Sequence, residues 1–139
     1  KAQMFEGLID FVEQSVFAFV RQIADREPAG SAQVARTVAL ILQFAEKNPG
    51  MARVMTGDAL VFENERLQER MNLLFDKLES AFKQSLRDGG IQSETPTVDA
   101  QVTASLLVAF MMGRMQRFAR SGFKRLPSEN LQASLARIL

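Results

Sequence analysis

The sequence contains no cysteine, histidine, tryptophan or tyrosine. Without cysteine there is neither a disulfide scaffold nor thiol chemistry. Without histidine, the usual zinc sites and Ser-His or Cys-His catalysis each lack a required part. An enzyme of this composition would have to use Asp, Glu, Lys or Ser alone. We therefore expect a protein that is not an enzyme, and we expect neither a metal site nor a cofactor.

Charge of one sign and long apolar runs are also lacking. The 17 basic and 16 acidic side chains leave a net charge of +1, whereas a free-standing nucleic-acid binder is usually more basic. The apolar run Val16–Val20 is far shorter than the roughly 18 residues of a membrane span, so no membrane contact is expected. The 139 residues, 47% of them hydrophobic, suffice for one domain with a substantial core.

Helical periodicity runs through the whole chain, and no strand alternation persists. A first helix is predicted from about Lys1 to Arg26, ended by Pro28 and Gly30. A second helix is predicted to begin at a Ser31 cap. The apolar positions at helical spacing that should face the core are Phe5, Leu8, Ile9, Val12, Val16, Phe19, Val20, Ile23, Val34, Val38, Ile41, Leu42 and Ala45.

A short helix is predicted over Pro49–Thr56, between two sharp boundaries. Asn48 can cap it through its side-chain oxygen, and Pro49 suits the first helical position, where its missing N–H costs nothing. Gly57 can adopt the left-handed conformation that ends a helix, and Asp58 can cap the next one.

Two long helices and a final short one are predicted to follow. The first runs from about Ala59 to Arg87 and ends at Gly89-Gly90, with a Glu79–Lys83 pair on its exposed face. After a polar loop at 91–96, the second runs to about Arg120 and closes at Gly122, and Pro127-Ser128 opens the last helix to Leu139. The core positions of the first long helix are Leu60, Asn64, Leu67, Met71, Leu74, Leu78, Phe82 and Ser85. The sequence thus predicts a single all-α domain over residues 1–139, a bundle of about six helices.

The last two of these helices have the pattern of an association surface. Gly113 costs roughly 1 kcal/mol inside a helix, so close approach of a second helix would explain its presence. An internal core needs the same apolar face, so the pattern leaves core and dimer interface open. The candidate interface residues are Ala104, Val108, Ala109, Met111, Met112, Gly113, Met115, Phe118, Leu131 and Leu135.

Three segments carry a family resemblance: the run of caps and apolar positions at Asn48–Phe75, the basic segment Arg117–Arg125, and the opening Lys1–Ile9. They resemble the nucleoid-occlusion factors, a branch of the TetR superfamily of helical dimeric DNA-binding proteins. The opening resembles the start of the fourth helix of TetR-type proteins. The resemblance covers essentially the whole chain and implies a TetR-type C-terminal regulatory and dimerisation domain.

In that family three helices containing the DNA-reading helix-turn-helix precede this point, so we expect an N-terminal head that is absent from this chain. The resemblance implies a homodimer formed through the last two helices, which binds chromosomal DNA through the head. It also implies binding to the C-terminal tail of the tubulin-like division GTPase, which blocks division-ring assembly over the chromosome. The expected location is therefore cytoplasmic and nucleoid-associated. The alternative is a TetR-type repressor whose Phe and Met residues line a pocket for a small apolar ligand.

A groove for an acidic, partly apolar tail can be assembled from the first two helices. Phe11 lies off the core stripe between the small residues Gly7 and Ser15, and Leu40 and Phe44 lie off the stripe of the second helix. The family positions for tail binding fall on Phe11, Leu40, Gln43, Lys47 and Asn48. Lys47 replaces an Arg, and Gln43 stands where a Gly is expected, which narrows the groove. The alternative is that Phe11 and Leu40 are second-face core residues.

Two charged clusters have simpler explanations than binding. The cations Arg114, Arg117, Arg120, Lys124 and Arg125 complement a helix C-terminus, although contacts to DNA phosphate or an acidic partner remain open. Residues Glu63, Glu65 and Glu69 alternate with Arg66 and Arg70, as on a solvated, salt-bridged face rather than in a metal cage. No residue of this chain is therefore assigned to base reading or to a metal.

Overall fold

The computed structural model describes residues 2–57 and 65–139, and within them every regular element is an α-helix. The helices are α1 (Ala2–Arg26), α2 (Ser31–Lys47), α3 (Pro49–Met55), α4 (Glu65–Asp88), α5 (Pro96–Arg120) and α6 (Leu131–Ile138). The all-α prediction with about six helices is confirmed. The predicted Asp58 cap, and the part of the long helix predicted at 59–64, lie outside the described residues.

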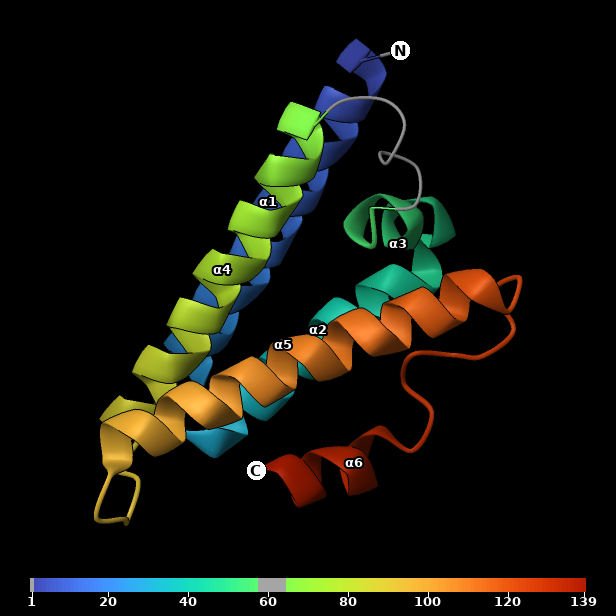
Figure 1. Cartoon of the computed structure of the whole chain (residues 1–139). Coiled ribbons are helices and arrows are strands. Elements are labelled where there is room, and N and C mark those ends of the chain that lie inside the picture. Colours follow the sequence, from blue (N-terminus) through green and yellow to red (C-terminus); the bar gives the residue numbers. More distant parts are fainter. Residues whose placement is uncertain (1, 58–64) are drawn as a thin grey trace.

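The helices pack as crossed pairs (Figure 1). Helices α1 and α4 run side by side, and α5 crosses the end of α4, with which it makes the most extensive helix contact in the described residues. Helix α2 lies behind α5, the short α3 continues from its end, and α6 lies below α5 in this view. Helix α2 packs against α1, and a hollow lined by both α2 and α6 lies beside it.

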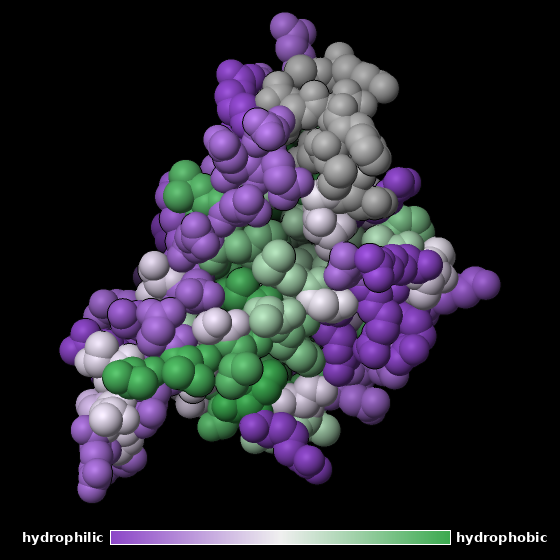
Figure 2. All heavy atoms as spheres, in the orientation of Figure 1, coloured by the Kyte–Doolittle hydropathy of each residue, from purple (hydrophilic) through white to green (hydrophobic). Residues whose placement is uncertain are grey.

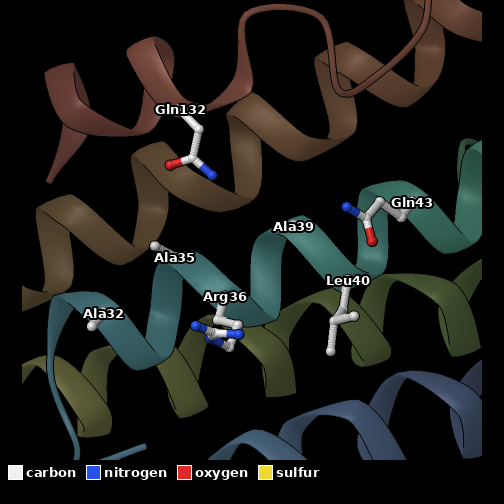
Figure 3. Close-up of a pocket in the computed structure, with 7 residues that line it drawn as sticks. All are labelled: Ala32, Ala35, Arg36, Ala39, Leu40, Gln43 and Gln132. Carbon is white, nitrogen blue, oxygen red and sulfur yellow. The ribbon is translucent and has the colours of Figure 1, made fainter.

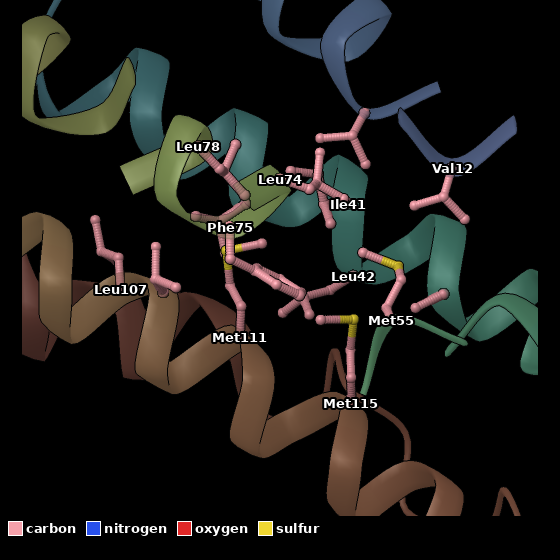
Figure 4. Close-up of a cluster of buried hydrophobic side chains, with 14 of the residues drawn as sticks. Val12, Ile41, Leu42, Met55, Leu74, Phe75, Leu78, Leu107, Met111 and Met115 are labelled. Carbon is pink, nitrogen blue, oxygen red and sulfur yellow. The ribbon is translucent and has the colours of Figure 1, made fainter. Parts of the chain in front are cut away.

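The core forms where α1, α2, α4 and α5 meet (Figure 4). Val12, Ile41, Leu78 and Met111 have no exposed surface. Methionine is unbranched and adaptable, so Met111 and its neighbours can fill the irregular space between crossing helices. The predicted core positions of α2 and of the described part of α4 are all buried, while Leu8, Phe19 and Val20 of α1 are only partly buried at its edge.

Most predicted helix ends are confirmed, but two caps are wrong. Pro49 is the first residue of α3, and Gly57 has a positive φ of 81° as predicted. Asn48 precedes α3, yet its side chain does not cap it. Instead Asn48 Nδ2 donates to the carbonyl of Phe44 at 2.9 Å and closes the end of α2. Ser31 is already helical, because Gly30, at φ 131°, takes the cap position before α2.

The start of the last helix is also corrected. Helix α6 begins at Leu131, four residues after Pro127, because Asn130 has the left-handed conformation (φ 52°) that a right-handed helix cannot continue through. Residues 127–130 form a turn instead. Glu46 of α2 fixes that turn by accepting a hydrogen bond of 2.7 Å from the Ser128 N–H.

The expected Glu79–Lys83 pair gives way to a contact between helices. Gln101 of α5 donates from Nε2 to Glu79 Oε2 of α4 at 3.1 Å. The Glu79 carboxylate therefore links α4 to α5. The sequence had predicted that it would instead link two neighbouring turns of its own helix.

Candidate functional site

An aromatic cluster with one exposed ring lies between α1 and α2. It comprises Phe11, Phe19 and Phe44. The ring centroid of Phe44 is 5.9 Å from that of Phe11 and 5.7 Å from that of Phe19, distances at which tilted aromatic pairs attract. Phe11 keeps 48% of its surface exposed, which is incompatible with a core residue. An exposed aromatic ring supported by a second ring is a suitable apolar contact for a ligand.

The candidate residues of α2 continue from this cluster along the helix. Leu40 and Asn48 are partly buried, while Gln43 and Lys47 are exposed. Leu40 and Gln43 line a hollow of about 370 Å³ between α2 and α6, whose remaining lining residues are Ala32, Ala35, Arg36, Ala39 and Gln132. Figure 3 shows Arg36 and Leu40 on one side of α2, with Gln132 extending from α6 toward Ala35. Gln43 is exposed and lines this same hollow.

The structure therefore brings the five candidate tail residues onto one region of α1 and α2. Phe44, which contacts Phe11, and Arg36, one turn before Leu40, also belong to this region. The sequence had already placed Phe44 off the core stripe beside Leu40, and the spacing of four residues before Leu40 could have indicated Arg36 as well. Phe19 was placed in the core stripe, but it lies at the core's edge and packs edge-on against Phe44.

Helix α5 has two different faces, which divide the candidate interface residues. The candidates in the chain's own core are Ala104, Val108, Met111, Met115, Phe118, Leu131 and Leu135. The candidates Ala109, Met112 and Gly113 are exposed. They continue an outer row of exposed apolar side chains formed by Val98, Val102 and Leu106. In Figure 2 this row is the green band along the N-terminal half of α5, and hydrophilic residues gather toward its C-terminal end.

Arg114, one of the five clustered cations, has a structural role. Its guanidinium donates to the carbonyls of Pro127 and Glu129 and, at 3.0 Å, to Ser134 Oγ. It also lies 4.7 Å from the centroid of the Phe110 ring. Burial, and then the positive charge of Arg117, lower the pKa of Arg114. Arg114 thus fastens the turn at 127–130 and helix α6 to α5.

The other cations of this cluster lie near the surface. Arg117, Arg120 and Arg125 line a shallow hollow of about 380 Å³ at the end of α5. Arg125 donates two hydrogen bonds to the carboxylate of Glu129, at 3.0 and 3.2 Å. These hydrogen bonds raise the pKa of Arg125 and lower that of Glu129. This pair supports the interpretation of a charged, solvated helix end.

Ion pairs connect α1 with α4 next to the aromatic cluster. Arg70 donates to Asp10 at 2.6 Å and also to Glu13, while Arg66 donates to Glu6. The hydrogen bond to Asp10 is the main cause of the raised pKa of Arg70. The acidic side chains of this part of α1 are therefore neutralised by α4.

Neither a metal site nor a membrane span is found in the part of the chain that the structure describes. No group of three or more acidic side chains converges there as metal ligands would. No described helix combines the length and the apolarity needed to cross a bilayer.

A family model for the SlmA-like, tetracycline-repressor-like C-terminal domain matches residues 29–138. That match and the six-helix architecture define the class of protein, a TetR-type C-terminal domain. Sequence comparison with individual proteins then identifies the family within this class. The nucleoid occlusion factor SlmA of Idiomarina loihiensis is 45% identical over 134 residues, which are 96% of this chain and 68% of that protein. SlmA of Aliivibrio fischeri strain MJ11 is 44% identical over 131 residues, or 94% of this chain and 67% of that protein.

SlmA of Vibrio cholerae is 41% identical over 131 residues, again 94% of this chain and 67% of that protein. The chain belongs to the SlmA family of nucleoid occlusion factors. These relatives are named nucleoid occlusion factors, and none of the three is named as an enzyme or a ligand-sensing repressor. The comparisons therefore favour the first interpretation of the sequence over the small-molecule alternative.

Proposed function

We propose that this chain is the regulatory and dimerisation domain of a nucleoid occlusion factor, and that it binds the C-terminal tail of the tubulin-like division GTPase. The observation that carries the proposal is the exposed Phe11, supported by the ring of Phe44 and followed along α2 by Leu40 and Lys47. A short peptide can bury apolar side chains against the rings and the leucine while an acidic group pairs with the lysine. Gln43 and Asn48 border this surface.

Dimerisation is proposed through the outer face of α5. That face exposes an apolar row, and the small residues Ala109 and Gly113 leave space for close approach of a second backbone. The buried candidates act indirectly, by holding α5 and α6 in place beneath that face. A second copy bound there would cover apolar surface that the isolated chain leaves in water.

In the intact protein, the dimer is proposed to bind chromosomal DNA through a helix-turn-helix part outside residues 1–139. The near-neutral charge of this domain fits that division of labour, because phosphate contacts need a concentration of basic side chains. Association with the nucleoid then places the tail-binding surface over the chromosome, where division-ring assembly is to be blocked.

The experiment that tests tail binding is a titration of a fluorescent peptide, copied from the division GTPase tail, with this chain. Phe11→Ala should weaken binding about tenfold or more, because exposed aromatic anchors dominate such contacts. The separate variant Lys47→Glu should also weaken binding, and more strongly at low salt than at high salt. Leu73→Ala removes an equally exposed side chain from α4 (Leu73 is 52% exposed) and serves as the control. If Phe11→Ala and Lys47→Glu both bind the peptide as tightly as the wild type, the proposal is wrong.

A further inference from the structure

A row of side chains on α2 includes two of the five candidate tail-binding residues and extends beyond them. Arg36, Leu40, Phe44 and Lys47 follow one another at intervals of four, four and three residues. We call them the α2 row. Such intervals keep side chains on one side of a helix. Two apolar side chains thus lie in the middle, with a cation at each end.

Arg36 lines the hollow between α2 and α6, where its side chain is accessible to a ligand. Its side chain keeps 62% of its surface exposed, and its Nε donates to Glu27 at 2.9 Å. A guanidinium has four further N–H donors, enough for a second carboxylate. Arg36 and Leu40 line the same hollow of about 370 Å³, so a peptide on Leu40 comes within reach of Arg36.

Three acidic side chains of α1 and α2 have partners outside the α2 row, whereas Glu27, just after α1, pairs with Arg36. Asp10 and Glu13 are bound by Arg70. Glu46 accepts the hydrogen bond of the Ser128 N–H. Arg36 is paired with Glu27 but keeps four N–H donors for a second carboxylate, and Lys47 is exposed at the other end of the row.

We infer that Arg36 is a further peptide-binding residue, and that the surface takes an extended peptide with an apolar centre and an acidic side chain at each end. This inference rests on the proposed function. Each helical residue adds about 1.5 Å, so Arg36 and Lys47 lie about 16 Å apart along the helix axis. An extended peptide covers about 3.3 Å per residue, so its two carboxylates should be about five residues apart.

The test is fluorescence anisotropy of the tail peptide, titrated with the wild-type chain and with Arg36→Gln, which removes the positive charge and keeps the first three side-chain carbons. The matched control is Arg87→Gln, which removes an exposed arginine from α4, outside the α2 row. Arg36→Gln should weaken binding about three- to tenfold at low salt and less at high salt, as expected for a charge-assisted contact at the surface. Arg87→Gln should leave the affinity unchanged.

A second peptide, with the acidic residues at one end converted to amides, locates the contact. Against the peptide that lacks the carboxylate facing Arg36, the Arg36→Gln variant should bind as tightly as the wild type. Equal affinity of wild type and Arg36→Gln for the unmodified peptide, with binding still lost in Phe11→Ala, would overturn the inference and leave the proposed function in place. A wild-type chain that fails to bind the tail would overturn both.

Discussion

At the scale of single residues, Ser85 and Gly89 show what joins α4 to the turn between α1 and α2. Ser85, an interruption in the apolar stripe of α4, accepts a hydrogen bond from the Gly30 N–H at 3.1 Å and donates to Gln33 Oε1 at 2.6 Å. Gln33 in turn donates to the carbonyl of Glu27 at 2.9 Å. A polar group at this buried position is stable because its hydrogen bonds are made within the protein.

Gly89 is needed for the same junction, because the backbone of the turn approaches it too closely for any side chain. A Cβ at position 89 would lie 2.4 Å from Gly30 Cα and 2.8 Å from the Ala29 carbonyl oxygen. Gly89→Ala should therefore lower the free energy of unfolding by about 1–3 kcal/mol, the usual cost of overpacking. Urea unfolding followed by circular dichroism measures it. Gly50→Ala is the control, since nothing lies within 4 Å of its Cβ position, and equal stability of the two variants would contradict the prediction.

At the scale of elements, the two faces of α5 divide the two roles that its apolar pattern left open, internal core and dimer interface. Its inner face, including Met111 and Met115, is fully buried against the other helices. Its outer face exposes Val102 and Leu106 by 52% and 54%. A row of apolar side chains on the exposed face of a helix is typical of a surface that binds a partner.

Gly113 tests that assignment, because its Cβ position faces open space within the chain. Gly113→Ala should stabilise the helix by up to about 1 kcal/mol. Gly113→Leu should weaken self-association, since a bulky side chain separates helices that pack closely at glycine. Sedimentation velocity should then show a shift from dimer to monomer at micromolar concentration. Gly7→Leu, at a second glycine with open space in α1, is the control, and an unchanged dimer in Gly113→Leu would argue against this face.

At the scale of the whole molecule, the absence of histidine and the bound carboxylates set the pH dependence of stability. Arg125 lowers the pKa of Glu129, so the folded state takes up that proton less readily than the unfolded state. This contribution is present above the ordinary carboxyl pKa and is lost as the pH falls through the lowered one.

The free energy of unfolding should therefore be nearly constant between about pH 5.5 and 7, where no unperturbed side chain of this chain titrates. It should fall below pH 4.5, the ordinary value for a Glu. Urea unfolding across this range checks it, and Glu129→Gln should lose part of the acid dependence. A marked change in stability between pH 6 and 7 would contradict the prediction.

How far the sequence predicted the candidate site differs from residue to residue. The off-stripe positions of Phe11 and Leu40 marked them as candidates, because a residue away from the core stripe needs another explanation. The partner of Phe11 was harder to assign, since Phe44 is distant in sequence and the contact depends on how α1 packs on α2. In the sequence Arg36 is indistinguishable from any solvated arginine, because its place on the hollow beside Leu40 and Gln132 depends on the packing of α6 near α2.

The sequence by itself determined the number of helices, most of their ends and the faces they bury. Those features depend on local forces: the 3.6-residue period of apolar side chains, proline at a helix start and glycine at its end. The tertiary structure alone decided where α6 begins, that Arg114 holds the turn at 127–130, and which face of α5 remains exposed. Each of these depends on groups far apart in sequence, such as Glu46 and Ser128, whose meeting is fixed by the packing of whole helices.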